Sequence, residues 1–142
     1  MTSNRPYLIR AMHEWIGDNG MTPYLLVDGV AKLMSFLSKA FDASELERRL
    51  RPDGSIMHAE VRIGDSILMM GEPMGEFGPM PASIYLYVSD CDSVYQRALQ
   101  ANGVSVMEPT TRPAEGDRYG GVKDPSGNIW WIATHLEDAS AE

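Results

Sequence analysis

The sequence predicts an α+β fold in which two βαβββ modules form a curved mixed sheet with a concave cavity, preceded by an N-terminal helix. The first observation is a repeat, because the order of one strand, one helix and three strands is expected twice, at an offset of about 60 residues. At that offset Tyr24 aligns with Tyr85, and Val27 aligns with Val88. The second observation is a hairpin near the end of the chain, where residues 124–127 form a turn containing Pro and Gly between two strand-like segments.

Module one is expected to cover residues 21–71, and a Gly- and Pro-rich linker follows over 72–82. Within the module, apolar residues recur at helical spacing after Gly29, and a Pro-Asp-Gly turn separates two of the later strands. The third strand alternates, with Ala59 and Val61 on one face and His58 and Glu60 on the other. The expected elements are a strand over 22–28, a helix over 30–41 and strands over 45–50, 56–63 and 66–70.

Module two is expected to cover residues 83–137, and a short acidic tail occupies 138–142. Asp90 is a candidate helix cap, and Asn102 with Gly103 marks the end of that helix. The expected elements are a strand over 83–88, a helix over 90–102, a strand over 104–108, a polar loop over 110–117, and hairpin strands over 119–123 and 129–134.

A short amphipathic helix is expected over residues 5–19, so that residues 1–20 form a segment of their own. Leu8, Met12 and Trp15 share one face of this helix. An isolated helix of this length needs a surface to pack against, either on its own domain or on a second subunit.

The formal net charge of −8 argues against a nucleic-acid or anionic-membrane partner and is compatible with a cationic or neutral small molecule. Cys91 is the single cysteine, which excludes an internal disulfide. No apolar run has the length needed to span a membrane, and no signal-peptide pattern begins the chain, so a cytoplasmic protein is expected.

Four segments carry a resemblance to a known family: TPYLLVDG at 22–29, IMHAEVRIGDS at 56–66, YLYVSDCD at 85–92 and GDRYGGVKDPSGNIWWIATH at 116–135. Residues 21–137 resemble the vicinal oxygen chelate superfamily, which has the glyoxalase/bleomycin resistance/dioxygenase fold, and the PhnB-like branch in particular. The resemblance implies a cavity between the modules that holds a small-molecule ligand.

Residues 5–28 are similar to a different protein, the N-terminal helix and first strand of the SspB protease adaptor, through Arg5-Pro6-Tyr7-Leu8, Glu14-Trp15 and Thr22-Pro23. The basic C-terminal tail of that adaptor is absent here, so its function does not carry over. The resemblance implies a dimer-forming role for the helix, and a homodimer is expected.

Metal-dependent members of the superfamily place His and Glu ligands at positions that map to Thr22, Met69, Ser83 and Trp131. None of these is a good metal ligand, so neither a metal nor another cofactor is expected. His58 and Glu60 share a strand face and can act as two ligands or as an acid–base couple. Alternatively, they are polar side chains that bond to Arg62, to Arg118 or to each other.

The aromatic residues suggest where a ligand binds. By period two Tyr24, Tyr85 and Tyr87 share the concave face with Trp131, whereas Trp130 faces the helices. These rings either fill the cavity as core or stack on a flat or cationic ligand. The residues expected to bind a ligand are Tyr24, His58, Glu60, Met69, Tyr85, Tyr87, Arg118 and Trp131.

Four functions stay open at this point. The first is metal-free binding of a small molecule, aromatic or cationic, in an aromatic-lined cavity. The second is sequestration of a drug, as in bleomycin-binding relatives. The third is a metal-dependent lyase or dioxygenase with non-standard ligands, and the fourth is a scaffold in which the N-terminal helix only forms a dimer interface.

Overall fold

The computed structural model describes residues 20–137, so the helix expected over 5–19 and the tail at 138–142 lie outside the described residues. Within these limits the two βαβββ modules are confirmed. Module one contains β1 (Tyr24–Leu26), α2 (Val30–Phe41), β2 (Ser44–Leu50), β3 (Ile56–Ile63) and β4 (Ser66–Gly71). Module two contains β5 (Ser83–Tyr87), α3 (Cys91–Gln100), β6 (Val104–Arg112), the short 3-10 helix η1 (Pro113–Glu115), β7 (Asp117–Lys123) and β8 (Ile129–His135).

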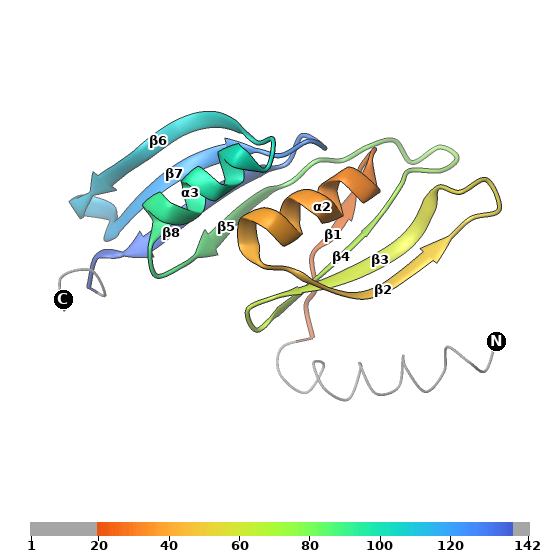
Figure 1. The fold of residues 1–142 in the computed structure, drawn as a ribbon, viewed down its shortest axis with the longest axis horizontal. Coiled ribbons are helices and arrows are strands. Elements are labelled where there is room, and N and C mark those ends of the chain that lie inside the picture. Colours follow the sequence, from red (N-terminus) through yellow and green to blue (C-terminus); the bar gives the residue numbers. More distant parts are fainter. Residues whose placement is uncertain (1–19, 138–142) are drawn as a thin grey trace.

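Each module forms its own four-stranded mixed sheet, in the orders β1-β4-β3-β2 and β5-β8-β7-β6. The first strand of each module pairs in parallel with the last, and the other neighbours are antiparallel. The modules lie side by side, giving an elongated molecule (Figure 1). The two sheets share no ladder, but the amide of Met80 in the linker donates to the carbonyl of Leu26 over 2.7 Å. The exact module limits, 21–71 and 83–137, stay a prediction.

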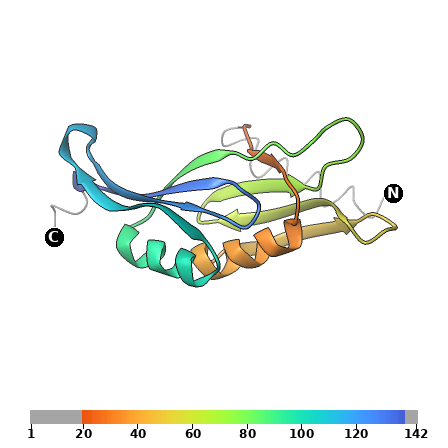
Figure 2. The same ribbon diagram turned by 90° about the horizontal axis from the view of Figure 1, so that it is seen from above.

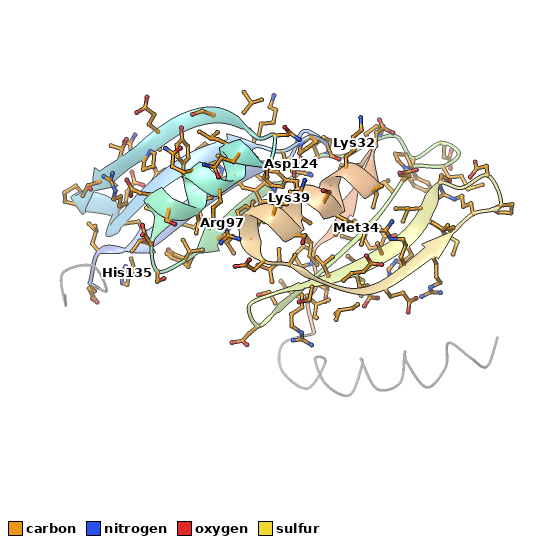
Figure 3. All side chains as sticks on the ribbon, viewed as in Figure 1. Lys32, Met34, Lys39, Arg97, Asp124 and His135 are labelled. Atoms are coloured by element: carbon orange, nitrogen blue, oxygen red, sulfur yellow. The ribbon has the colours of Figure 1, made fainter. Side chains whose placement is uncertain are left out.

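Helices α2 and α3 cover the same side of the two sheets (Figure 2). Arg97 of α3 lies where the helices meet (Figure 3), and its guanidinium donates to the Asp42 carboxylate over 2.7 Å. The core lies between helices and sheets, where the rings of Phe41 and Trp130 are 4.9 Å apart. We call the opposite side of each sheet its open face, because neither α2 nor α3 covers it.

The last hairpin forms as expected, with Asp124 fixing its turn. The buried Asp124 carboxylate accepts the backbone amides of Ser126 and Asn128 over 2.8 and 3.0 Å, and the indole N–H of Trp130 over 2.8 Å. Trp130 is therefore held in the core, while the adjacent Trp131 projects onto the open face. This confirms the assignment of the two indoles to opposite faces.

The prediction of a polar loop over residues 110–117 is wrong. Strand β6 continues to Arg112, and β7 begins at Asp117, so only η1 and Gly116 connect them. A register shift between Met107 and Thr110 contains Pro109, which has no amide proton to donate. The ladder therefore resumes after the proline, and Arg112 pairs with Asp117. Among the described residues, no helix is long and apolar enough to cross a membrane.

Candidate functional site

Four aromatic side chains gather on the open face of module two. We call them the aromatic cluster: Tyr85 and Tyr87 from β5, Tyr119 from β7 and Trp131 from β8. The ring centroid of Tyr85 lies 5.3 Å from that of Tyr87 and 5.7 Å from that of Tyr119. The ring centroids of Tyr119 and Trp131 are 6.2 Å apart. These edge-to-face arrangements are the favourable ones for aromatic pairs, so the rings support one another.

The aromatic cluster borders a hollow of about 370 Å³, lined by Ser83, Tyr85, Tyr119 and Trp131. The strand register brings Tyr85, Trp131 and Gly121 into one row. Gly121 leaves room for the indole, since a Cβ there would lie 2.7 Å from Cζ3 of Trp131. The indole N–H of Trp131 donates to Ser83 Oγ over 2.8 Å, which fixes the ring beside the hollow.

The Asp117 carboxylate accepts hydrogen bonds from two tyrosines of the aromatic cluster. Its Oδ2 accepts the hydroxyls of Tyr85 and Tyr87 over 3.0 and 2.9 Å, and its Oδ1 lies 3.3 Å from Nδ1 of His135. Burial disfavours ionisation of this carboxyl, but the bonds from Tyr87, Tyr85 and His135 together hold the pKa of Asp117 below its usual value. Burial and the bond to Asp117 raise the pKa of Tyr85, which therefore stays a phenol at neutral pH.

A positive charge already lies against the aromatic cluster. The guanidinium carbon of Arg112 is 5.6 Å from the centroid of the Tyr119 ring, a cation–π distance. The hydroxyl of Tyr119 donates to Glu115 over 2.9 Å. Tyr85 and Tyr87 also line a second hollow of about 650 Å³ between the modules, opposite Ile63 to Ser66.

A second group of side chains lies on the open face of module one. The Tyr24 hydroxyl is 3.3 Å from Nδ1 of His58, and Nε2 of His58 is 2.8 Å from Oε2 of Glu60. The register places Tyr24, Met69 and Glu60 in one row across β1, β4 and β3. The Glu60 side chain is 2% exposed. A bond between His58 and Glu60 was one of the alternatives predicted from the sequence.

The structure thus brings seven of the eight expected ligand-binding residues onto the two open faces, with Tyr24, His58, Glu60 and Met69 in module one and Tyr85, Tyr87 and Trp131 in module two. Arg118 lies on the helix side instead. Its Nε and Nη2 both donate over 2.8 Å to the Asp92 carboxylate in α3. That these residues bind a ligand stays a prediction.

Asp117, Tyr119, Arg112 and His135 are not among the residues predicted from the sequence to form the site. In the structure His135 lies at the far end of module two (Figure 3), bonded to the Gly116 carbonyl over 2.9 Å. The pairing of the two hairpin strands contains enough information to place Asp117 and Tyr119. Counting back from the turn pairs Gly121 with Trp131, which places Tyr119 and Asp117 on the same face.

The positions that hold a metal in metal-dependent relatives do not fit one here. Thr22, Met69, Ser83 and Trp131 offer two hydroxyls, a thioether and an indole, which are poor donors for the divalent metals of such sites. Within residues 20–137, no group of three or more His, Cys, Asp or Glu side chains converges in a way that could hold a metal ion. His58 and Glu60 provide two donors only.

Two curated relatives match this chain in sequence. An uncharacterized protein of Mycobacterium tuberculosis H37Rv, Rv0887c, is 33% identical over 160 aligned residues, which cover 100% of this chain and 93% of that protein. A stringent starvation protein B homolog of Haemophilus influenzae is 62% identical over 24 residues, which are 17% of this chain and 16% of that protein. The second match is local and supports only a resemblance of one segment.

Solved structures show the same fold at low sequence identity. TioX from Micromonospora sp. ML1 has a TM-score of 0.68 at 24% identity, covering 82% of this chain and 98% of TioX. The PhnB protein from Bacillus cereus has a TM-score of 0.61 at 18% identity, covering 80% of this chain and 98% of the PhnB protein. The fosfomycin resistance protein FosX from Listeria monocytogenes has a TM-score of 0.66 at 15% identity, covering 83% of this chain and 94% of FosX. Residues 20–132 match the Glyoxalase/Bleomycin resistance protein/Dioxygenase superfamily, and the chain belongs to that superfamily.

Proposed function

We propose that this protein binds a small, flat aromatic molecule without a metal, and that the ligand lies against the aromatic cluster of module two. The observation that carries the proposal is the hollow of about 370 Å³ between Tyr85, Tyr119 and Trp131. Its volume is in the range of small-molecule sites, and three of its four lining side chains are aromatic. Ser83 and the tyrosine hydroxyls supply polar groups that orient a ligand.

A cationic ligand suits this surface better than an anionic one. Aromatic ring faces attract cations, although Arg112 already lies 5.6 Å from the Tyr119 centroid and opposes a second cation at that ring. The buried carboxylate of Asp117 lies beneath Tyr85, and the protein carries a formal net charge of −8. The aromatic faces and these negative charges lower the free energy of a bound cation relative to a bound anion.

The experiment is a titration of the full chain, followed by tryptophan fluorescence, with two flat aromatic probes of opposite charge. Proflavine is cationic, and 1-anilinonaphthalene-8-sulfonate is anionic. We expect saturable quenching by proflavine that is lost in Trp131→Leu, and weaker binding of the anionic probe. Equal binding of proflavine by Trp131→Leu and the natural chain would place the ligand elsewhere.

Drug sequestration is the second candidate. It is favoured by the likeness in fold to a protein described as a fosfomycin resistance protein, and by the acidic charge. Bleomycin is a cationic, partly flat molecule, so the same titration with bleomycin tests it. An unchanged fluorescence spectrum up to high micromolar bleomycin argues against this function.

We also propose that the protein is a homodimer. The resemblance of residues 5–28 to the dimer-forming segment of the SspB adaptor supports this. Light scattering should give the mass of a dimer. The same measurement after deletion of residues 1–19 tests whether that segment forms the interface, and an unchanged dimer removes that role.

A further inference from the structure

Tyr24, His58 and Glu60 form a continuous chain of hydrogen bonds across the sheet of module one. Its links are 3.3 Å from the Tyr24 hydroxyl to Nδ1 of His58 and 2.8 Å from Nε2 of His58 to Glu60. Exposure rises along it, from 2% at the Glu60 side chain to 17% at His58 and 48% at Tyr24. The chain therefore runs from the protein interior to the open face.

The chemistry of the three groups fixes the direction of these bonds. As a carboxylate Glu60 only accepts, so Nε2 of His58 carries the proton and donates it. Nδ1 then has a free lone pair, and the Tyr24 hydroxyl donates to it. This is the arrangement in which a base is oriented by a third group and acts on an exposed hydroxyl.

The neighbouring charges suit the exchange of a proton at Tyr24. On β2, Glu47 and Arg49 pair with Glu60 and His58 in the strand register, and Arg49 also donates to Glu47. Burial raises the pKa of Tyr24, while the positive charges of Arg51 and Arg49 act in the opposite direction. The net effect keeps Tyr24 protonated at neutral pH, so that its hydroxyl can pass a proton inward.

Module two supplies an internal comparison. The row Tyr24, Met69 and Glu60 corresponds in register to the row Tyr85, Trp131 and Gly121. Two residues before Glu60 is His58, and two before Gly121 is Tyr119. The same fold therefore accepts apolar or aromatic residues at both positions, so a buried histidine–carboxylate pair is not a requirement of the fold. Burying the Glu60 carboxylate costs free energy that its hydrogen bond to His58 offsets, and an apolar or aromatic residue avoids this cost altogether.

Gly71 makes room for the outer end of the chain. A Cβ at this position would lie 2.7 Å from the Tyr24 hydroxyl and 2.5 Å from the Met57 carbonyl oxygen. The absence of a side chain lets the phenol reach His58 from the edge strand. The ring centroids of Tyr24 and His58 lie 5.7 Å apart.

We infer that Tyr24, His58 and Glu60 are a proton relay that performs acid–base chemistry on a small, weakly acidic molecule at the open face of module one. The substrate gives a proton to Tyr24 Oη as the tyrosine proton moves to Nδ1 of His58. The substrate is left as an anion, and the imidazolium is held by Glu60. Return of the proton to another atom completes an isomerisation, and loss of a leaving group completes an elimination. The inference does not depend on the ligand proposed for module two.

The test uses 5-nitrobenzisoxazole, which opens when a base removes its C3 proton. The N–O bond breaks, its electrons stay on oxygen, and the coloured product is 2-cyano-4-nitrophenolate. We expect the full chain to accelerate this reaction above buffer, and Tyr24→Phe to lower the rate about tenfold or more. Tyr95→Phe is the matched control, because it removes a tyrosine hydroxyl bonded to Ser105, away from either open face.

A second measurement separates a relay from a structural hydrogen bond. In ¹⁵N NMR of histidine-labelled protein, we expect the neutral form of His58 to carry its proton on Nε2, and we expect Glu60→Gln to lower the rate. A rate no higher than buffer, an equal rate in Tyr24→Phe, or a proton on Nδ1 of His58 would each overturn the relay. Tyr24 is half exposed, so Tyr24→Phe tests the relay even where Glu60→Gln does not fold.

Discussion

The Tyr85 hydroxyl donates to the nearly buried carboxylate of Asp117 over 3.0 Å, and this bond joins the aromatic cluster to the strand that the sequence analysis took for a loop. Tyr87 and His135 bond to the same carboxylate. One acidic side chain thus orients two rings of the proposed ligand site.

Asp117→Asn should therefore destabilise the protein by about 1–3 kcal/mol, because an amide cannot accept all three donors with both of its polar atoms. Urea unfolding followed by far-UV circular dichroism measures the change. Asp65→Asn, in the exposed turn between β3 and β4, is the matched control and should change stability little. Equal effects of the two substitutions would mean that the Asp117 bonds contribute nothing.

The contribution of His135 should depend on pH. Its bonds to the Gly116 carbonyl and to Asp117 raise the pKa of His135 above the value of 6.5 expected in the unfolded chain. A raised folded-state pKa gives stability that is fully present below pH 6.5 and is lost as pH rises through the folded-state pKa. Asp117 stays ionised over this window, because its own pKa is lowered.

His135→Gln should accordingly lose more unfolding free energy at about pH 5.5 than at about pH 9, measured against the natural chain in urea. Glu137 is 3.7 Å from Nε2 of His135 and adds to the same effect. A difference between the two proteins that does not vary with pH would contradict the assigned bonds.

Asp124→Asn should be one of the more destabilising substitutions, costing about 2–3 kcal/mol. The buried carboxylate accepts four donors, two backbone amides and the side chains of Asn128 and Trp130. Asp53→Asn is the control, since Asp53 also closes a turn, through Ser55, but lies exposed. Thermal unfolding should show a large shift for the first substitution and a small one for the second.

Gly121→Ala should weaken proflavine binding about tenfold, because a Cβ at 2.7 Å from the Trp131 ring forces the indole to move. Gly78→Ala is the control, since nothing lies within 4 Å of a Cβ there. Arg118→Ala removes the bond to Asp92 on the helix side and should leave the affinity unchanged. If Arg118→Ala weakened binding as much as Gly121→Ala, the ligand would not lie on the open face.

The sequence was sufficient for the features that depend on local periodicity. The repeat, the hairpin turn and the opposite directions of Trp130 and Trp131 follow from turn chemistry and period two. The face on which Arg118 lies could not be assigned, because the hairpin strand was expected to begin at residue 119, whereas β7 begins at Asp117. Once Asp117 starts the strand, alternation places Arg118 on the same side as Val122, which is buried in the core.

Contacts between distant side chains could not be predicted in this way. Tyr24 and His58 are 34 residues apart, and their bond depends on a ring crossing the sheet over Gly71. Periodicity assigns a side chain to a face but does not give its direction on that face. The same limit applies to Arg112, which reaches the Tyr119 ring from the neighbouring strand.

Trp131 and Trp130 provide the most direct test of the proposed ligand site, because their indole N–H groups have different partners. Trp131 donates to Ser83 beside the hollow, and Trp130 donates to Asp124 in the core. In ¹H–¹⁵N NMR of the full chain titrated with proflavine, the Trp131 indole signal should shift and saturate, while the Trp130 signal stays in place. A Trp131 signal that does not move at millimolar proflavine would contradict the account.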